Sequence, residues 1–113
     1  MQVSAFTPRG MDQTIATPKS QANVTVTGAG VQTIDLTAVG APYASDTQAR
    51  FMVDGTQPIA WCFGTGAGLT YNNGEAMLGN SLELFDIPRG VTTIAVTATA
   101  AGSVLRVMPG DGN

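Results

Sequence analysis

Short stretches of alternating apolar and polar residues, separated by Gly, Asn and Pro, fill most of the chain after its first 20 residues. Successive side chains of a β-strand point to opposite faces, so this alternation is typical of strands with one buried face. The clearest example is 22–27. It places Ala22, Val24 and Val26 on one face and polar side chains on the other. The pattern limits the chain to folds that are built from half-buried β-strands.

The segment 31–37 repeats the pattern and directs Ile34 and Leu36 inward. It is separated from 22–27 by Gly28-Ala29-Gly30, a composition that is typical of turns. Two alternating segments joined by a short glycine-rich turn favour antiparallel pairing. We therefore predict a β-hairpin over 22–37.

Further strand candidates follow at intervals of about ten residues, the spacing of a β-sandwich or barrel. In chain order they are 50–53, 59–63, 82–85, 91–98 and 104–108. A chain of 113 residues has room for one core. We predict an all-β, single-domain β-sandwich, jelly-roll-like, in which 75–78 forms at most one helical turn. The predicted core consists of Ile59, Trp61, Phe63, Leu84, Phe85, Ile94, Val96 and Leu105.

The first 20 residues differ from the rest because they are rich in Thr, Pro, Gly and Gln. Weak alternation at Val3, Ala5 and Thr7 indicates an extended segment. We predict an extended N-terminal arm over 1–20, followed by the β-sandwich domain over 21–113. A frayed terminus or an edge strand explains such an arm. The alternative is an arm that pairs with a neighbouring subunit, since an extended segment can add to an open sheet edge.

Charge is scarce in this chain, at 12% of residues against an average of about 25% for soluble domains. The net charge is −3 and no basic patch is evident, which argues against nucleic acid as a partner. No apolar run approaches the roughly 18 residues of a membrane span. The N-terminus also lacks the cationic start and apolar run of a signal peptide. We expect synthesis in a cytoplasm and no membrane partner.

The chain contains no His, which excludes Ser-His-Asp and Cys-His catalytic arrangements and histidine metal sites. Cys62 cannot form an internal disulfide, and its neighbours Trp61 and Phe63 favour a small buried side chain. The glycine-rich run 64–68 lacks the Lys and the following helix of a phosphate-binding loop, so we interpret it as a hairpin loop. We predict no enzyme activity, no cofactor and no metal. Turn roles are expected for most of the scattered acidic residues Asp46, Asp54, Glu75, Glu83, Asp86 and Asp111.

Two tyrosines, Tyr43 and Tyr71, lie in loop-like surroundings, whereas Phe51, Trp61, Phe63 and Phe85 lie in alternating strands. Aromatic residues at strand positions favour a core over a stacking platform. The tyrosines are the better candidates for contacts with a partner. The candidate interface residues are Val3, Phe6, Arg9, Tyr43 and Tyr71.

The residue order over 50–113 also resembles a known group. Residues 50–64 read as a strand, a Gly-Thr turn, and an apolar-aromatic strand closing in Phe63-Gly64. The segments 82–85, 90–96 and 101–112 follow in order, and the last ends in Pro109-Gly110-Asp111-Gly112. In these four pieces the chain resembles small β-rich proteins encoded among the virion genes of tailed bacteriophages. It departs from them at 78–81, where the group tends to have a Pro-Gly turn.

The resemblance implies a virion structural protein, specifically a capsid decoration or cement protein on the outer surface of the major capsid protein lattice. Its place would be the capsid surface of the virion, and either a trimer or a dimer of the chain would fit the symmetry of a capsid lattice. A Thr-rich β-module of low charge suits this role because its flat surface and open strand edges favour repeated protein contacts. Two alternatives remain open. One is a tail or fibre component, and the other is a carbohydrate-binding β-module that uses Tyr43, Trp61 or Tyr71.

Overall fold

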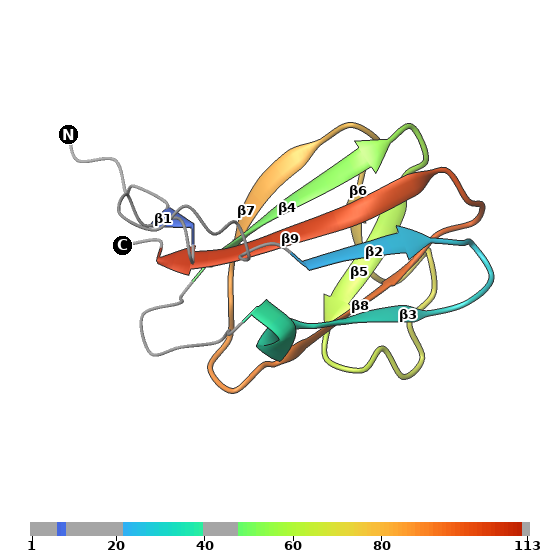
Figure 1. Ribbon diagram of the computed structural model, residues 1–113. Coiled ribbons are helices and arrows are strands. Elements are labelled where there is room, and N and C mark those ends of the chain that lie inside the picture. Colours follow the sequence, from blue (N-terminus) through green and yellow to red (C-terminus); the bar gives the residue numbers. More distant parts are fainter. Residues whose placement is uncertain (1–6, 9–21, 40–47, 112–113) are drawn as a thin grey trace.

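The computed structural model describes residues 7–8, 22–39 and 48–111, which form two antiparallel β-sheets packed face to face (Figure 1). The elements in chain order are β1 (Thr7–Pro8), β2 (Ala22–Val26), β3 (Gln32–Asp35), the 3-10 turn η1 (Leu36–Val39), β4 (Gln48–Gly55), β5 (Ile59–Phe63), β6 (Glu75–Met77), β7 (Leu82–Asp86), β8 (Thr93–Thr97) and β9 (Ser103–Asp111). None of the helical residues in these ranges belongs to a segment long and apolar enough to cross a membrane.

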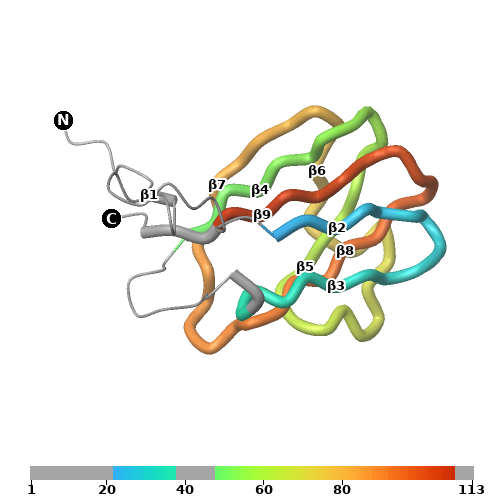
Figure 2. The backbone as a smooth tube through the Cα atoms, viewed as in Figure 1, coloured from blue at the N-terminus to red at the C-terminus, as the bar shows by residue number. Residues whose placement is uncertain are grey.

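The order of the strands defines a jelly roll. Sheet A has the order β1-β9-β4-β7, with β2 also paired to β9, and sheet B has the order β3-β8-β5-β6. Figure 2 shows β2, β9, β4 and β7 side by side in sheet A. The antiparallel pairs β2–β9, β3–β8, β4–β7 and β5–β6 form one long ribbon, which rolls up so that β9 meets β4 and β8 meets β5. Eight strands that form two sheets in this way have the jelly-roll architecture. The predicted all-β sandwich is confirmed.

The core lies between the sheets and follows from strand alternation. In β4, Ala49, Phe51 and Val53 are buried, while Arg50 and Met52 between them are only half-buried. The buried core side chains are Val26, Ile34, Leu36, Ala49, Phe51, Val53, Ile59, Trp61, Met77, Ile94, Val96, Ala98, Leu105 and Val107. Because both sheets direct every second residue inward, apolar area is removed from water along their whole length.

Most of the predicted core residues are confirmed. Ile59, Trp61, Ile94, Val96 and Leu105 are buried, and Phe63 and Phe85 pack against the core while partly exposed. Leu84 is the exception, because 47% of its surface is exposed. In the β4–β7 register Phe85 lies opposite the buried Ala49, so its neighbour Leu84 must point to the other face.

The predicted hairpin over 22–37 is wrong. β2 pairs with β9 in sheet A and β3 pairs with β8 in sheet B, so the turn between them passes from one sheet to the other. Side-chain hydrogen bonds link the end of β2 to the start of β3 in place of a backbone ladder. Gln32 Nε2 donates to the Thr25 carbonyl at 2.6 Å, and the Thr27 N–H donates to Gln32 Oε1 at 2.7 Å.

Two turn predictions also require correction. The segment 75–78 contains strand β6, which pairs with β5, instead of a helical turn. Asp111 lies in β9, because the ladder continues through Gly110, which pairs with Gln48 on one side and Pro8 on the other. Thr7 and Pro8 of the predicted arm thus pair with β9 of the same chain. The rest of the arm lies outside the described residues.

Candidate interaction surface

The outer face of sheet A carries a set of apolar side chains, which we call the outer-face patch. It consists of Met52, Leu82, Leu84, Val104 and Met108. The register places Leu82 beside Met52, and Leu84 across from Arg50, which is next to Met108. Leu82 and Leu84 are 51% and 47% exposed, and the other members are half-buried. An apolar group of this kind on one sheet face is a candidate contact surface for another protein.

Two arginines lie within the outer-face patch. Arg106 lies across from Met52, and its Nη2 is 2.9 Å from Asp54 Oδ2, with the side chains 30% and 54% exposed. An ion pair this exposed contributes only about 0–1 kcal/mol. The Nε of Arg50 is buried and has no hydrogen-bond partner among the described residues. The arginines therefore interrupt the apolar side chains, while Leu82 and Leu84 remain about half exposed.

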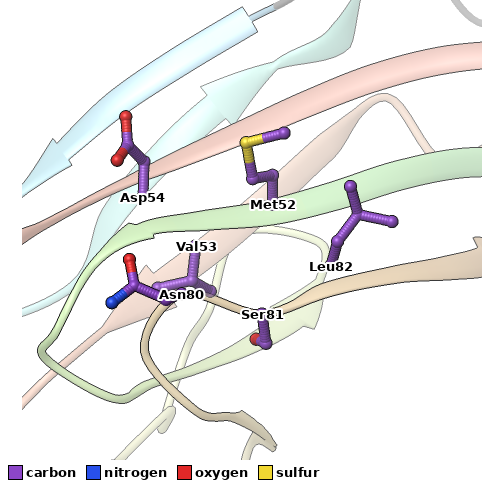
Figure 3. Close-up of a pocket in the computed structure, with 6 residues that line it drawn as sticks. All are labelled: Met52, Val53, Asp54, Asn80, Ser81 and Leu82. Carbon is purple, nitrogen blue, oxygen red and sulfur yellow. The ribbon is translucent and has the colours of Figure 1, made fainter.

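A hollow of about 280 Å³ opens at one end of the outer-face patch (Figure 3). Met52, Val53, Asp54, Asn80, Ser81 and Leu82 line it. Pockets for small molecules usually measure about 300–1,000 Å³, and they enclose most of the ligand. The hollow is at the lower limit of this range and is open to solvent. Its dimensions therefore suit a protruding side chain of another protein.

The turn between β6 and β7 fixes the shape of this hollow. Asn80 has a φ of 53°, and its N–H donates to the Gly55 carbonyl at 2.8 Å while its Oδ1 accepts from the Gly55 N–H at 3.2 Å. Ser81 Oγ donates to the Leu78 carbonyl at 2.6 Å. These bonds involve short side chains that lose little conformational entropy. The rim is therefore held in place before any partner binds.

β7 forms the edge of sheet A among the described strands. The Val53 N–H donates to the Ser81 carbonyl at 2.9 Å. This bond shows which residues of β7 direct their backbone groups toward β4 in the β4–β7 ladder. In an antiparallel ladder alternate residues bond to the same neighbour. The backbone groups of Glu83 and Phe85 therefore face β4, and those of Leu82, Leu84 and Asp86 face away from it. The exposed leucines thus coincide with backbone groups that no described strand pairs.

The centre of the outer face of sheet B is covered. Ala60, Ala95 and Thr97 point outward by alternation, yet they are 0%, 0% and 7% exposed. The β5–β6 connection folds over the two alanines: a Cβ at Gly66 would lie 2.5 Å from Ala95 Cβ, and one at Gly74 would lie 3.1 Å from Ala60 Cβ. The glycine-rich run is therefore a hairpin loop, as predicted.

Of the predicted interface residues, only Tyr71 lies in a described part of the chain, while Val3, Phe6, Arg9 and Tyr43 lie outside it. Tyr71 is half-buried in the β5–β6 connection over sheet B, so it is not part of the outer-face patch. Its role stays a prediction. Sequence reasoning missed Leu82 and Leu84, although the alternation of 82–85 required either Leu84 or Phe85 to point outward.

Trp61 is only 3% exposed, which removes it from any sugar-stacking platform. Its ring centroid is 4.2 Å from that of Phe51 and 4.7 Å from that of Phe85, so these aromatics belong to the core as predicted. Cys62 beside it is half-buried rather than buried. The carbohydrate-binding alternative therefore retains only the tyrosines.

The turn roles expected for the acidic residues are wrong for the five that the structure describes. Asp54, Glu75, Glu83, Asp86 and Asp111 all lie within strands. Asp54 pairs with Arg106, and Asp86 Oδ1 accepts a hydrogen bond from Gln48 Nε2 at 3.1 Å. No three potential metal ligands among the described His, Cys, Asp and Glu residues come together.

These features define a jelly-roll β-sandwich in which a loop covers the centre of the outer face of sheet B, while the outer face of sheet A is open and partly apolar. Comparison with solved structures gives similarity to a protein of Bacillus endospore appendages, which are disulfide-linked pili. The identity is 18% and the TM-score 0.42, over 80% of this chain and 83% of the other. The coat protein of Tobacco streak virus is similar at 13% identity and a TM-score of 0.39, over 83% of this chain and 88% of the other. No protein-family model and no curated protein matches the chain. Both scores are low, so the function is argued below from the residues of this chain.

Proposed function

We propose that this chain is a structural protein of a tailed-bacteriophage virion, namely a capsid decoration or cement protein. It binds the outer surface of the major capsid protein lattice and stabilises the head. The observation that carries the proposal is the pair of exposed leucines, Leu82 and Leu84, on the open face and edge of sheet A. The resemblance of 50–113 to small virion proteins supports the assignment to a phage particle.

The physical properties of the surface suit repeated contacts on a lattice. A standard protein interface buries about 800 Å² on each partner. A trimer or a dimer of this chain would make several such contacts at once, and linked contacts bind far more tightly than each one alone. A homo-oligomer at a symmetry axis of the lattice would therefore bind tightly through individually modest surfaces.

The proposed protein is non-catalytic, and the types and positions of its polar residues support this. The chain has no His, and among the described acidic side chains Asp54 pairs with Arg106 and Asp86 accepts a hydrogen bond from Gln48. A paired-carboxylate mechanism needs two such groups to converge on one substrate. The described residues contain no such convergence.

Capsids that lack this protein provide the test. Purified full-length protein, mixed with such capsids and sedimented, should bind saturably and raise the temperature at which the shells disrupt. Failure to bind would overturn the proposal. Labelled copies on intact virions should be found on the head, whereas labelling of the tail would support the tail component instead.

A further inference from the structure

The open edge of β7 combines backbone groups, apolar side chains and charge in one pattern. We infer that β7 binds an extended segment of a partner protein as an added strand, with alternating apolar, basic and apolar residues. The inference rests on the proposed function, because the partner there is the major capsid protein. It specifies the part of this chain that makes the contact and the chemistry of the segment that it receives.

Every second residue of β7 directs its backbone groups toward the open edge of sheet A. Leu82, Leu84 and Asp86 direct their N–H and C=O groups away from β4, and no described strand lies on that side. Unpaired edge groups of this kind are a template for another strand. Strand addition obtains affinity from main-chain hydrogen bonds and specificity from pockets for alternate side chains. β7 offers both within five residues.

The apolar positions of the added strand follow from the outer-face patch. Side chains opposite Leu82 and Leu84 would lie on the outer face of the sheet, because directly opposed residues share a face at about 4.5–5.5 Å between Cβ atoms. There they would cover the two leucines, which are about half exposed. A side chain near Leu82 would also reach the hollow of about 280 Å³ beside it.

The basic position follows from Glu83. This residue points to the inner face, opposite Phe51, and is exposed because it lies at the sheet edge. β7 also contains Asp86 and has no cation. Arg50 is on the neighbouring strand but on the opposite face, across from Leu84. A Lys or Arg opposite Glu83 would therefore satisfy a charge that the described part of this chain leaves unpaired.

The same charges disfavour a second copy of this chain at the edge. Antiparallel pairing of two β7 strands centred on Glu83 would place the two Glu83 side chains directly opposite each other, and pairing centred on Leu84 would place them on a diagonal. Like charges on opposed strands destabilise the pairing, and an inward-pointing charge is a known protection against edge-to-edge association. Glu83 thus discriminates between self-association and a basic partner.

Leu84→Pro and Leu84→Ala separate strand addition from simple burial of leucine. Both remove the leucine side chain, but only proline removes the N–H that faces the open edge, and it leaves the β4 ladder bonds in place. With capsids lacking the protein as the probe, Leu84→Pro should bind at least about tenfold more weakly than Leu84→Ala. Leu78→Ala is the matched control, because Leu78 is 74% exposed but lies outside the strand. It should bind like the wild type. Equal binding by the two Leu84 variants would overturn the inference.

A charge series tests the basic position. Glu83→Lys should weaken capsid binding by about tenfold, and Glu83→Gln should have an intermediate effect that declines as salt is raised. Unchanged or tighter binding by Glu83→Lys would contradict a basic partner. A dimer of the purified protein that Leu84→Pro dissociates would show a second copy at the edge and would also overturn the inference.

Hydrogen exchange on the wild-type protein provides a readout that does not depend on the folding of a variant. The amides of Leu82, Leu84 and Asp86 should gain protection on capsids, while those of Glu83 and Phe85 are protected by β4 beforehand. Capsid binding without protection at Leu82 and Leu84 would overturn this inference but not the proposed function. Absence of capsid binding would instead overturn the proposed function.

Discussion

Trp61 connects the two sheets through its ring contacts. It lies on β5 of sheet B, and it packs against Phe51 and Phe85 of sheet A at centroid distances of 4.2 and 4.7 Å. Phe63 on its own strand is 4.9 Å away at an interplanar angle of 82°. Edge-to-face pairs of this kind add about 0.5–1.5 kcal/mol each beyond the burial of their surface. A single residue thus supports both layers of the sandwich.

We expect Trp61→Ala to lower the free energy of unfolding by about 3–5 kcal/mol, because it removes these contacts and leaves a cavity. This loss is a large part of the stability of a small domain. Denaturant unfolding measures it, with Leu78→Ala as an exposed control that should change little. A thermal midpoint unaffected by Trp61→Ala would show that the core has been misplaced.

Asp35 makes stability depend on pH at the end of β3. Its Oδ1 accepts hydrogen bonds from Thr37 Oγ1 at 2.6 Å and the Thr37 N–H at 2.9 Å, which hold the pKa of the carboxyl below its ordinary value of 3.8. A lowered pKa means that the folded state favours the carboxylate. Its contribution is therefore complete above the ordinary pKa and is lost as pH falls through the lowered one.

Asp35→Ala should accordingly be less stable than the wild type at neutral pH. The difference should shrink as pH falls below about 4 and disappear once the carboxyl is protonated in both states. Unfolding by denaturant at a series of pH values provides the measurement. A difference that is constant from neutral to acidic pH would contradict the role of the carboxylate.

The β5–β6 connection is the element that closes sheet B, and its glycines allow a matched test. Gly66 and Gly68 both have a φ of 79°. A Cβ at Gly66 would meet Ala95 Cβ at 2.5 Å and Val31 Cγ1 at 2.8 Å, whereas one at Gly68 would meet nothing within 4 Å. Only Gly66 is therefore required by packing as well as by backbone conformation.

Gly68→Ala should cost about 1–2 kcal/mol, the penalty for a left-handed residue with a side chain. Gly66→Ala should cost a further 1–3 kcal/mol or so for overpacking against sheet B. Thermal or denaturant unfolding of both variants decides the matter. Equal losses for the two would show that the loop does not press on Ala95.

At this scale the sequence predicts strands better than it predicts their partners. Alternation over 22–27 and 59–63 correctly located β2 and β5, because a half-buried strand imposes a period of two. Pairing depends on long-range register, which alternation does not encode. The hairpin over 22–37 is wrong for this reason, since Val24 lies opposite Leu105 and Ile34 opposite Ile94.

The candidate surface also depends on strand pairing, which the sequence pattern does not reveal. Leu84 and Phe85 are adjacent apolar residues, and only one of them can face the core. The choice is made by the register with β4, which aligns Phe85 with Ala49. The lack of histidine-dependent sites follows from composition, because the chain has no His. The location of the exposed patch could not, because it depends on which strand forms the edge.

At the scale of the whole molecule, the two faces of the jelly roll are unequal. The β5–β6 loop buries Ala60 and Ala95 at the centre of sheet B, whereas sheet A leaves Leu82 and Leu84 exposed beside β7, which is an edge among the described strands. Under the proposed function, the outer face of sheet A would contact the capsid and the β5–β6 loop would face solvent.

The orientation of the molecule on a capsid tests this account most directly. Cryo-electron microscopy of capsids with and without the protein should give difference density on the outer surface of the shell. The jelly roll should fit that density with the outer-face patch and β7 toward the major capsid protein and the β5–β6 connection toward solvent. Density with sheet B against the shell, or no difference density at all, would contradict the account.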